Sequence, residues 1–225
     1  GIYVGYKYYE TAAQEGAIDY DKTVQYPFGY GLSYTEFEQK MGELKEKDGQ
    51  ISVDVEVTNT GDVAGKDVVE VYYKPPYTNG GIEKSSANLI EFAKTDLLQP
   101  GESQTVTVTF SIEDMASYDE NNAKAYVLEK GDYVISINSD SHTVLDQKTY
   151  TADKDVVYKG ENKRASDDTA ATNVFEDAKG DITYLSRADH FANYEKATAA
   201  PASAELGEPY VSEYHPVSYT HLTLP

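Results

Sequence analysis

The chain has 225 residues, enough for one or two domains with a sizeable core. Its 39 acidic and 19 basic side chains give a formal net charge of -20, which repels phosphate backbones and anionic lipid and so disfavours nucleic-acid binding. Cysteine is absent, which excludes disulfides, thiolate metal sites and a cysteine nucleophile, and the sequence contains no run of about 20 apolar residues that would predict a membrane-spanning segment.

Residues 1–45 are rich in aromatic side chains and glycine. The opening GIYVGYKYYE has no initiator methionine and no signal-peptide pattern, and its apolar residues predict a chain that begins within a strand. In QYPFGYGLSYTEF, Phe28, Tyr30 and Tyr34 alternate with glycine or serine, which indicates backbone that bends or approaches another segment closely. A segment this short cannot bury so many rings. We therefore expect it to expose apolar surface and to pack against protein outside the chain.

Residues 50–150 predict an independent all-β domain. Ile51, Val53, Val55 and Val57 alternate with polar residues, as in a half-buried strand. NTGDVAG predicts a turn and PPYTNGG a longer loop, because two prolines do not fit a central strand. About seven such strands predict a β-sandwich of the immunoglobulin or fibronectin type III kind. The further expected strands are DVVEVYYK, NLIEFAK, QTVTVTF, AYVLE, YVISIN and TVLDQKTY.

Residues 151–216 lose this periodicity and are polar, with glycine and proline interruptions. Too few apolar residues are present for a separate core, so the segment is expected to be an ordered connector lying over another domain. The expected apolar anchors are Val174, Phe175, Ile182, Tyr184, Leu185, Phe191 and Tyr194.

The last nine residues, VSYTHLTLP, have two interpretations. They can be encoded by a nucleotide sequence resembling the transposon-end adapter of shotgun sequencing libraries, or they form a native strand that includes Tyr219 and Leu222. Nine consecutive compatible codons favour the adapter, in which case the natural chain continues beyond His215 or Pro216.

Several motifs, in order along residues 1–150, closely resemble glycoside hydrolase family 3, the β-glucosidase type. GIYVGYKYYET and QYPFGYGLSYT resemble the end of the family's α/β sandwich domain. VDVEVTNTGDVAGKDVVEVYY, LQPGES and KGDYVISINSDS resemble its fibronectin type III-like domain. The resemblance predicts a mainly β chain in four parts. These are a remnant of the α/β sandwich domain (1–45), the fibronectin type III-like sandwich (46–152), an irregular connector (153–216) and the adapter translation (217–225).

The connector sequence GDITYLSRADHFANYEKATAAP resembles that of family members in which these domains precede the (β/α)8 barrel. On this interpretation, catalytic domains that the chain lacks flank it on both sides.

The resemblance also implies a retaining hydrolase of terminal β-linked sugars that needs no cofactor. Retention requires an Asp nucleophile, supplied by the barrel, and a Glu acid/base, supplied by the α/β sandwich domain, about 5–5.5 Å apart. No segment matches the nucleophile's motif, and the acid/base position falls before Gly1. No catalytic residue is therefore assigned, and the chain alone is predicted to be inactive. Its expected partners are a β-linked oligosaccharide or glycoside, bound by the complete enzyme, and the absent α/β sandwich and barrel domains.

Local carboxylates and histidines give little support for another active site. The close acidic pairs lie in polar, turn-like sequence, where capping and solvated roles are expected. The histidines have no serine or aspartate at a spacing typical of a triad or metal site. YDENN (118–122) lacks the central glycine and distal glutamate of a calcium loop. The pairs are Asp19/Asp21, Asp119/Glu120 and Asp167/Asp168, and the histidines are His142, His190 and His215.

The candidate substrate-cleft residues are aromatic or lie in a long loop. Tyr26, Phe28 and Tyr30 are candidates to line or support a sugar cleft at a domain junction, although packing under the α/β sandwich domain is the preferred interpretation. Tyr77 and Asn79 lie in a loop that is long for a sandwich connection and is a candidate to reach the barrel; a plain exposed loop is the default. The alternative function is a stand-alone immunoglobulin-like module for carbohydrate binding or adhesion, which would not need QYPFGYGLSYTEF.

Overall fold

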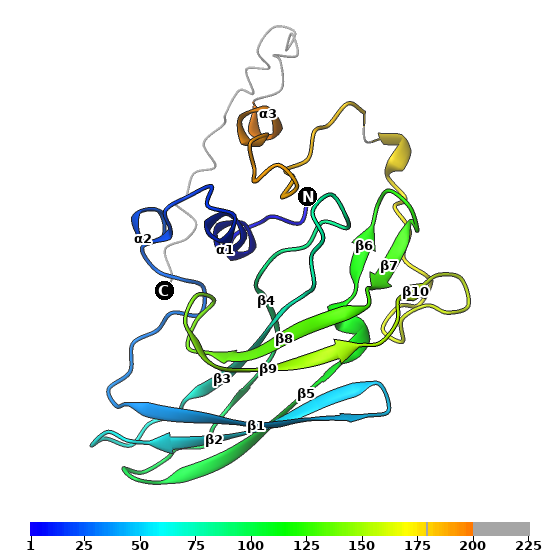
Figure 1. Ribbon diagram of the computed structural model, residues 1–225. Coiled ribbons are helices and arrows are strands. Elements are labelled where there is room, and N and C mark those ends of the chain that lie inside the picture. Colours follow the sequence, from blue (N-terminus) through cyan, green and yellow to red (C-terminus); the bar gives the residue numbers. More distant parts are fainter. Residues whose placement is uncertain (179, 200–225) are drawn as a thin grey trace, which may run out of the picture.

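Two facing β-sheets form the body of the structure, a computed structural model that describes residues 1–178 and 180–199 (Figure 1). One sheet has the strand order β1-β2-β5 and the other β4-β3-β8-β9, and all strand pairs are antiparallel. The strands are β1 (Phe37–Lys47), β2 (Gln50–Asn59), β3 (Val68–Lys74), β4 (Asn88–Lys94), β5 (Ser103–Ser111), β8 (Gly131–Asn138) and β9 (Val144–Ala152).

The alternating residues of these strands fill the space between the two sheets. Ile51, Val53, Val55 and Val57 are fully buried and lie in one cluster with residues of β3, β5 and β8. Polar residues at the intervening positions of β2 face away, as expected for strands with one buried face. The chain is thus mainly β, and its body is a β-sandwich, which confirms the expected fold class.

All seven strands expected from residues 50–150 are present, but one belongs to a different sheet. The segment AYVLE forms β7 (Ala125–Leu128), which pairs with β6 (Ser117–Asp119) and β10 (Val156–Tyr158) in a small third sheet. Its place in the sandwich is taken by β1, which pairs with β2 through a tight hairpin at Asp48 and Gly49. β1 begins at Phe37, inside the range 1–45 assigned to the preceding domain.

The expectation of a strand at the start of the chain is wrong, because a helix lies there. Gly5 adopts φ 58° and ψ -136°, a conformation that essentially only glycine tolerates, and it ends the extended run. Helix α1 (Tyr6–Gln14) follows, and its second half contains good helix formers such as Ala12, Ala13 and Gln14. A short helix, α2 (Tyr20–Thr23), comes next.

Helix α1 lies between the sandwich and the connector. Strands β8 and β9 separate α1 and α2 from the β1-β2-β5 sheet (Figure 1). On its other side, Ala12 packs with Tyr3 and Phe191 in a small second core. The connector contains the 3-10 helix η2 (Glu176–Ala178) and α3 (Tyr194–Thr198); a further 3-10 turn, η1 (Ile112–Met115), follows β5.

The expected anchors of the connector behave differently from one another. Phe191 is buried and Leu185 packs against the second core. Val174, Phe175 and Ile182 are exposed, so they do not anchor the segment to the described residues. The expected adapter translation and His215 lie outside the described residues. Within the described ranges, no helix is long and apolar enough to cross a membrane.

A buried amide fixes the turn that follows β2. The side chain of Asn59 is fully buried, and its Nδ2 donates to the carbonyls of Val63 (2.8 Å) and Leu98 (2.9 Å). Its Oδ1 accepts from Thr35 Oγ1 at 2.7 Å. One side chain therefore holds together the entry to β1, the NTGDVAG turn and the approach to β5.

Replacing Asn59 with alanine should lower the free energy of unfolding by about 1–3 kcal/mol, because the partner carbonyls and hydroxyl stay buried without hydrogen bonds. Urea unfolding measures this change. Asn121→Ala, at an exposed position, is the matched control and should stay within about 0.5 kcal/mol of the parent. Equal urea midpoints for Asn59→Ala and the parent would show that the Asn59 side chain does not stabilise the turn.

Candidate anchoring site and interdomain surface

The N-terminal helix is attached to the edge of the four-stranded sheet by hydroxyl groups. Thr11 is fully buried, and its Oγ1 accepts from the backbone N–H of Ser86 at 2.9 Å. The Tyr6 hydroxyl accepts from the N–H of Leu89, in β4, at 2.9 Å. Side chains of α1 thus satisfy backbone donors at an edge strand, where unpaired groups would otherwise remain.

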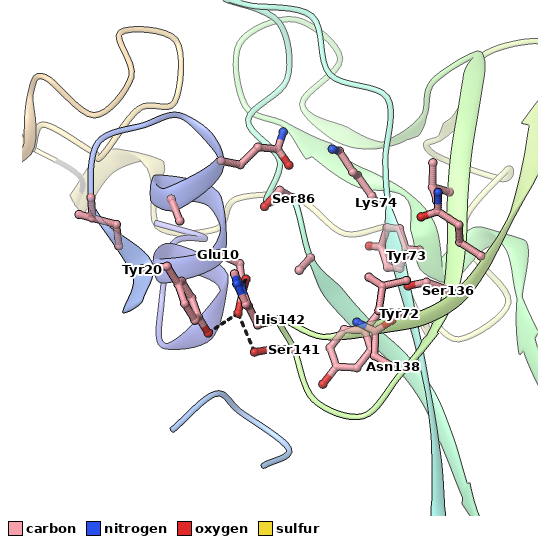
Figure 2. Close-up of a pocket in the computed structure, with 17 residues that line it drawn as sticks. Glu10, Tyr20, Tyr72, Tyr73, Lys74, Ser86, Ser136, Asn138, Ser141 and His142 are labelled. Carbon is pink, nitrogen blue, oxygen red and sulfur yellow. Dashed lines mark hydrogen bonds and ion pairs between the residues drawn. The ribbon is translucent and has the colours of Figure 1, made fainter. Parts of the chain in front are cut away.

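The Glu10 carboxylate is the centre of a polar network between α1, α2 and the β8–β9 loop (Figure 2). Its Oε1 accepts from the Tyr20 hydroxyl at 2.6 Å and from Ser141 Oγ at 2.8 Å. Its Oε2 lies 2.8 Å from His142 Nδ1, and the His142 ring stacks on Tyr20 with centroids 3.7 Å apart. Glu10 is only 8% exposed, so protein groups supply its hydrogen bonds.

This network holds structure together rather than presenting an active acid or base. Burial raises the pKa of the Tyr20 hydroxyl, and the hydrogen bond to Glu10 raises it further, so Tyr20 remains a proton donor. The loop is also fixed by Asp140, whose Oδ1 accepts from the N–H groups of His142 and Thr143. Sequence reasoning assigned His142 no partner because Glu10 lies 132 residues away along the chain.

The segment that contains Tyr26, Phe28 and Tyr30 lies beside this network. Phe28 stacks on Tyr6 with centroids 4.6 Å apart, and its carbonyl accepts from Ser141 N–H at 2.7 Å. The Tyr26 and Tyr30 rings are 5.1 Å apart. The structure therefore brings these three candidates together. An aromatic-lined pocket of about 410 Å³ runs along Tyr6, Tyr9, Tyr20, Tyr26 and Phe28.

Gly29 is required where this segment crosses β3. Its φ is 88°, and a Cβ there would lie 2.6 Å from Glu70 Oε2. The expected close approach of backbone to another segment therefore occurs at this glycine. Burial raises the pKa of Glu70, while a hydrogen bond from Tyr72 opposes the rise. Glu70 is covered by the glycine backbone and acts as a packing partner.

Much of the same segment is exposed. Leu32 is 90% exposed and Tyr34 98%, and about half of Tyr26, Phe28 and Tyr30 is also accessible. We call these five residues the aromatic surface. The expectation that residues 1–45 expose apolar side chains is confirmed here.

Tyr77 and Asn79 lie in a different neighbourhood, the loop between β3 and β4. The Arg187 guanidinium lies 4.1 Å from the centroid of the Tyr77 ring, which places Tyr77 against the connector. Asn79 is exposed. These two candidates therefore have different contacts from the aromatic surface.

The same loop carries a charged cluster that sequence reasoning missed. The Glu83 carboxylate accepts hydrogen bonds from Tyr3, Ser186 and Arg187. Arg187 Nε donates to Glu15 Oε1 at 2.5 Å, and His190 Nδ1 lies 2.7 Å from Glu15 Oε2. Glu15 follows the last residue of α1, so this cluster fastens the connector to the helix. Its members come from three distant parts of the chain, and no local pattern indicates them.

One member of each acidic pair has a structural partner: Asp119 caps a turn, as expected, while Asp19 and Asp167 form ion pairs that were not expected. Asp119 accepts from the N–H groups of residues 121–123. Asp19 pairs with Lys22, and Asp167 with Arg164. Among the described residues, no group of three or more His, Asp or Glu side chains is arranged to hold a metal ion.

Comparisons with known proteins identify the module. Residues 67–141 match the family model of the Fibronectin type III-like domain. A Kluyveromyces marxianus β-glucosidase is 36% identical over 160 residues, which are 71% of this chain and 18% of that protein. A Ruminococcus albus β-glucosidase is 39% identical over 156 residues, 68% of this chain and 15% of that protein.

Solved structures agree. β-Glucosidase 3B from Thermotoga neapolitana superposes with a TM-score of 0.59 at 35% identity, over 69% of this chain and 20% of that one. A GH3 β-glucosidase from Bifidobacterium adolescentis superposes with a TM-score of 0.58 at 31% identity, over 68% of this chain and 21% of that one. The module is therefore of the kind found in glycoside hydrolases. The chain therefore matches a part of the β-glucosidases of glycoside hydrolase family 3. It spans about a fifth of the length of the relatives it matches, which are proteins from bacteria and fungi.

Removing the Glu10 carboxylate should loosen the N-terminal helices without unfolding the sandwich. In Glu10→Ala, Tyr20, Ser141 and His142 lose their common acceptor, so amide exchange should accelerate at least about tenfold in residues 5–23 and 139–143. Hydrogen exchange detected by mass spectrometry measures this. Glu56→Ala, on the exposed face of β2, is the control and should change neither region. Unchanged exchange in Glu10→Ala would show that the network does not hold the helices.

The connector should detach from α1 in acid. Burial alone would raise the pKa of Glu15, but hydrogen bonds from Arg187 and His190 outweigh it and hold the pKa below its usual value. A lowered carboxyl pKa contributes stability above the unfolded-state value of about 4.3, and this is lost as pH falls through the folded-state value.

Exchange protection of residues 185–194 should therefore be constant near neutral pH, after correction for intrinsic rates, and should fall below about pH 4. In Glu15→Gln, the exchange protection of residues 185–194 should already be lower at neutral pH and should fall by less in acid. A parent-like acid transition in Glu15→Gln would assign the effect to another group.

Proposed function

We propose that this chain is the bracing part of a β-glucosidase that hydrolyses terminal β-linked sugars with retention of configuration. Residues 1–36 are the end of its α/β sandwich domain, and the sandwich from β1 onward is the fibronectin type III-like module. Residues 153–216 lead toward the barrel. The two catalytic carboxylates belong to the parts of the enzyme that lie outside this chain, and the substrate is a β-linked oligosaccharide or glycoside.

The observation that carries this proposal is the aromatic surface. The backbone beneath it is held in place by Phe28, Gly29 and the Glu10 network, yet Leu32 and Tyr34 project almost fully into solvent. Large apolar side chains on an ordered segment are typical of an interface with another protein part. The segment precedes β1 directly, where the family resemblance puts the junction with the α/β sandwich domain.

Within this assembly, the aromatic surface packs against the neighbouring catalytic domain and supports the sugar cleft from outside. Tyr26, Phe28 and Tyr30 provide the part that is already half covered by the chain itself. Tyr77, which shares its loop with Asn79, holds the connector side, since its ring is stacked beneath Arg187. The stand-alone binding module is not favoured, because the relatives are β-glucosidases and the aromatic surface has no role in such a module.

A chimeric enzyme tests the proposal. Residues 1–160 replace the matching segment of the Ruminococcus albus β-glucosidase, and hydrolysis of an aryl β-glucoside is measured. We expect the chimera to be active and Tyr34→Asp in it to lower activity at least about tenfold, because an unpaired charge would be buried at the interface. Phe92→Asp, at an exposed aromatic residue on β4 outside the aromatic surface, is the control and should have no effect.

The isolated chain supplies the other arm of this experiment. It should show no turnover of the same substrate at any concentration tested. Turnover by the isolated chain, or an active chimera that tolerates Tyr34→Asp as well as Phe92→Asp, would contradict the proposal.

A further inference from the structure

A cavity of about 510 Å³ lies between the N-terminal helices and the four-stranded sheet (Figure 2). Its walls come from α1, from Tyr20 of α2, from the outer face of β3 and β8, and from β9. The volume is within the range of small-molecule pockets, which is about 300–1,000 Å³. Its lining on the sheet lies mostly on the face opposite the sandwich core, although Tyr73 also packs against that core.

The cavity contains several polar side chains without protein partners. Asn138 is 2% exposed, and its Oδ1 is buried and accepts no hydrogen bond within the described residues. The side chains of Lys74, Ser136 and Gln147 also form no hydrogen bond or ion pair there, and those of Lys74 and Gln147 are exposed to solvent. Buried amide groups are normally satisfied, so an unpaired one that lines a cavity indicates a group which the cavity receives.

The sheet is distorted where it lines the cavity. The β8–β9 pairing shifts register between Ile137 and Asn138, and the β3–β4 pairing shifts between Val71 and Tyr72. Such irregularities redirect side chains and are frequent beside functional sites. Both occur in strands that line this cavity, and Asn138 and Tyr72 lie directly at them.

The unpaired groups define the chemistry of the ligand. Asn138 Oδ1 accepts hydrogen bonds and Lys74 Nζ donates them, so a ligand that contacts both must donate and accept. A hydroxyl group can donate and accept. The opposite wall holds the Glu10 carboxylate, and a carboxylate disfavours an anion beside it.

We propose that this cavity is a second, non-catalytic binding site for a neutral polyhydroxy compound of monosaccharide size. Hydroxyls of the ligand donate to Asn138 and accept from Lys74, with Ser136 and Gln147 completing the contacts. Tyr20, Tyr72 and Tyr73 line the walls and supply apolar surface for the carbon skeleton of a sugar. All the groups belong to this chain, so the site does not depend on the catalytic domains or on the proposed function.

The ligand joins elements that the Glu10 network also joins. Glu10, Tyr20, Ser141 and His142 form one wall of the cavity, while Asn138 and Lys74 belong to the sheet. A bound sugar therefore bridges α1 and α2 to β3 and β8. Occupancy should strengthen the attachment of the helices that precede the aromatic surface.

A titration of the ¹⁵N-labelled chain with D-glucose, followed by amide chemical shifts, tests the site. We expect saturable shifts in residues 72–74 and 134–147 with a dissociation constant in the millimolar range. Inorganic phosphate at the same ionic strength should produce no saturable shifts there. Asn138→Leu should weaken glucose binding at least about tenfold, which corresponds to loss of one well-made hydrogen bond.

Two further variants separate binding from folding. Lys74→Met alters an exposed residue, so the fold should persist while glucose binding weakens. Gln39→Leu removes the other buried amide with an unpaired oxygen, which lies outside the cavity lining, and should leave glucose binding unchanged. Absence of saturable shifts with glucose would overturn the proposal and assign the cavity to water. Equal affinities for the parent, Asn138→Leu and Lys74→Met, or saturable binding of phosphate at these residues, would also overturn it.

Discussion

The buried charge of Glu10 is the constraint on which the arrangement of the N-terminal segment depends. A carboxylate removed from water is costly unless hydrogen-bond donors surround it, and here they come from α2 and from the β8–β9 loop. The observed position of α1 on the sheet brings Tyr20, Ser141 and His142 to the same carboxylate. The network therefore selects a single docking geometry, where apolar packing alone would tolerate several.

The position of the aromatic surface follows from that geometry. Ser141 donates its hydroxyl to Glu10 and its backbone N–H to the Phe28 carbonyl, so the loop that satisfies the charge also fixes the segment after α2. Gly29 can then cross Glu70 at close range, and the chain is directed into β1. Leu32 and Tyr34 project outward because the backbone on both sides of them is already fixed.

Local sequence patterns predicted the elements whose structure is set locally. The alternation of Ile51, Val53, Val55 and Val57 predicted β2, since a strand with one buried face repeats every two residues. The opening of the chain was predicted wrongly, because Tyr3 and Tyr6 resemble strand residues while Gly5 ends the extended backbone there. Sequence alone does not show whether a single glycine will adopt a positive φ.

The candidate site was predictable only in part, for a similar reason. The glycines among the rings of residues 26–34 predicted a close approach and an apolar surface, which are properties of the segment itself. The Glu10 and Glu15 clusters join residues more than 100 positions apart, and a single sequence has no signal that pairs them. The sequence also contains no signal for the unpaired Asn138 Oδ1, because this residue lies at a register shift between β8 and β9.

Glu10, within α1, and Glu15, directly after it, give the helix two different attachments. Glu10 holds the sheet side through Ser141 and His142, while Glu15 holds the connector side through Arg187 and His190. The second attachment loses strength when Glu15 is protonated, whereas the sandwich core consists of apolar residues whose packing does not titrate. The connector can therefore detach from α1 while the sandwich stays folded. Such uneven stability suits a module that holds a fixed surface on one side and a chain leading to another domain on the other.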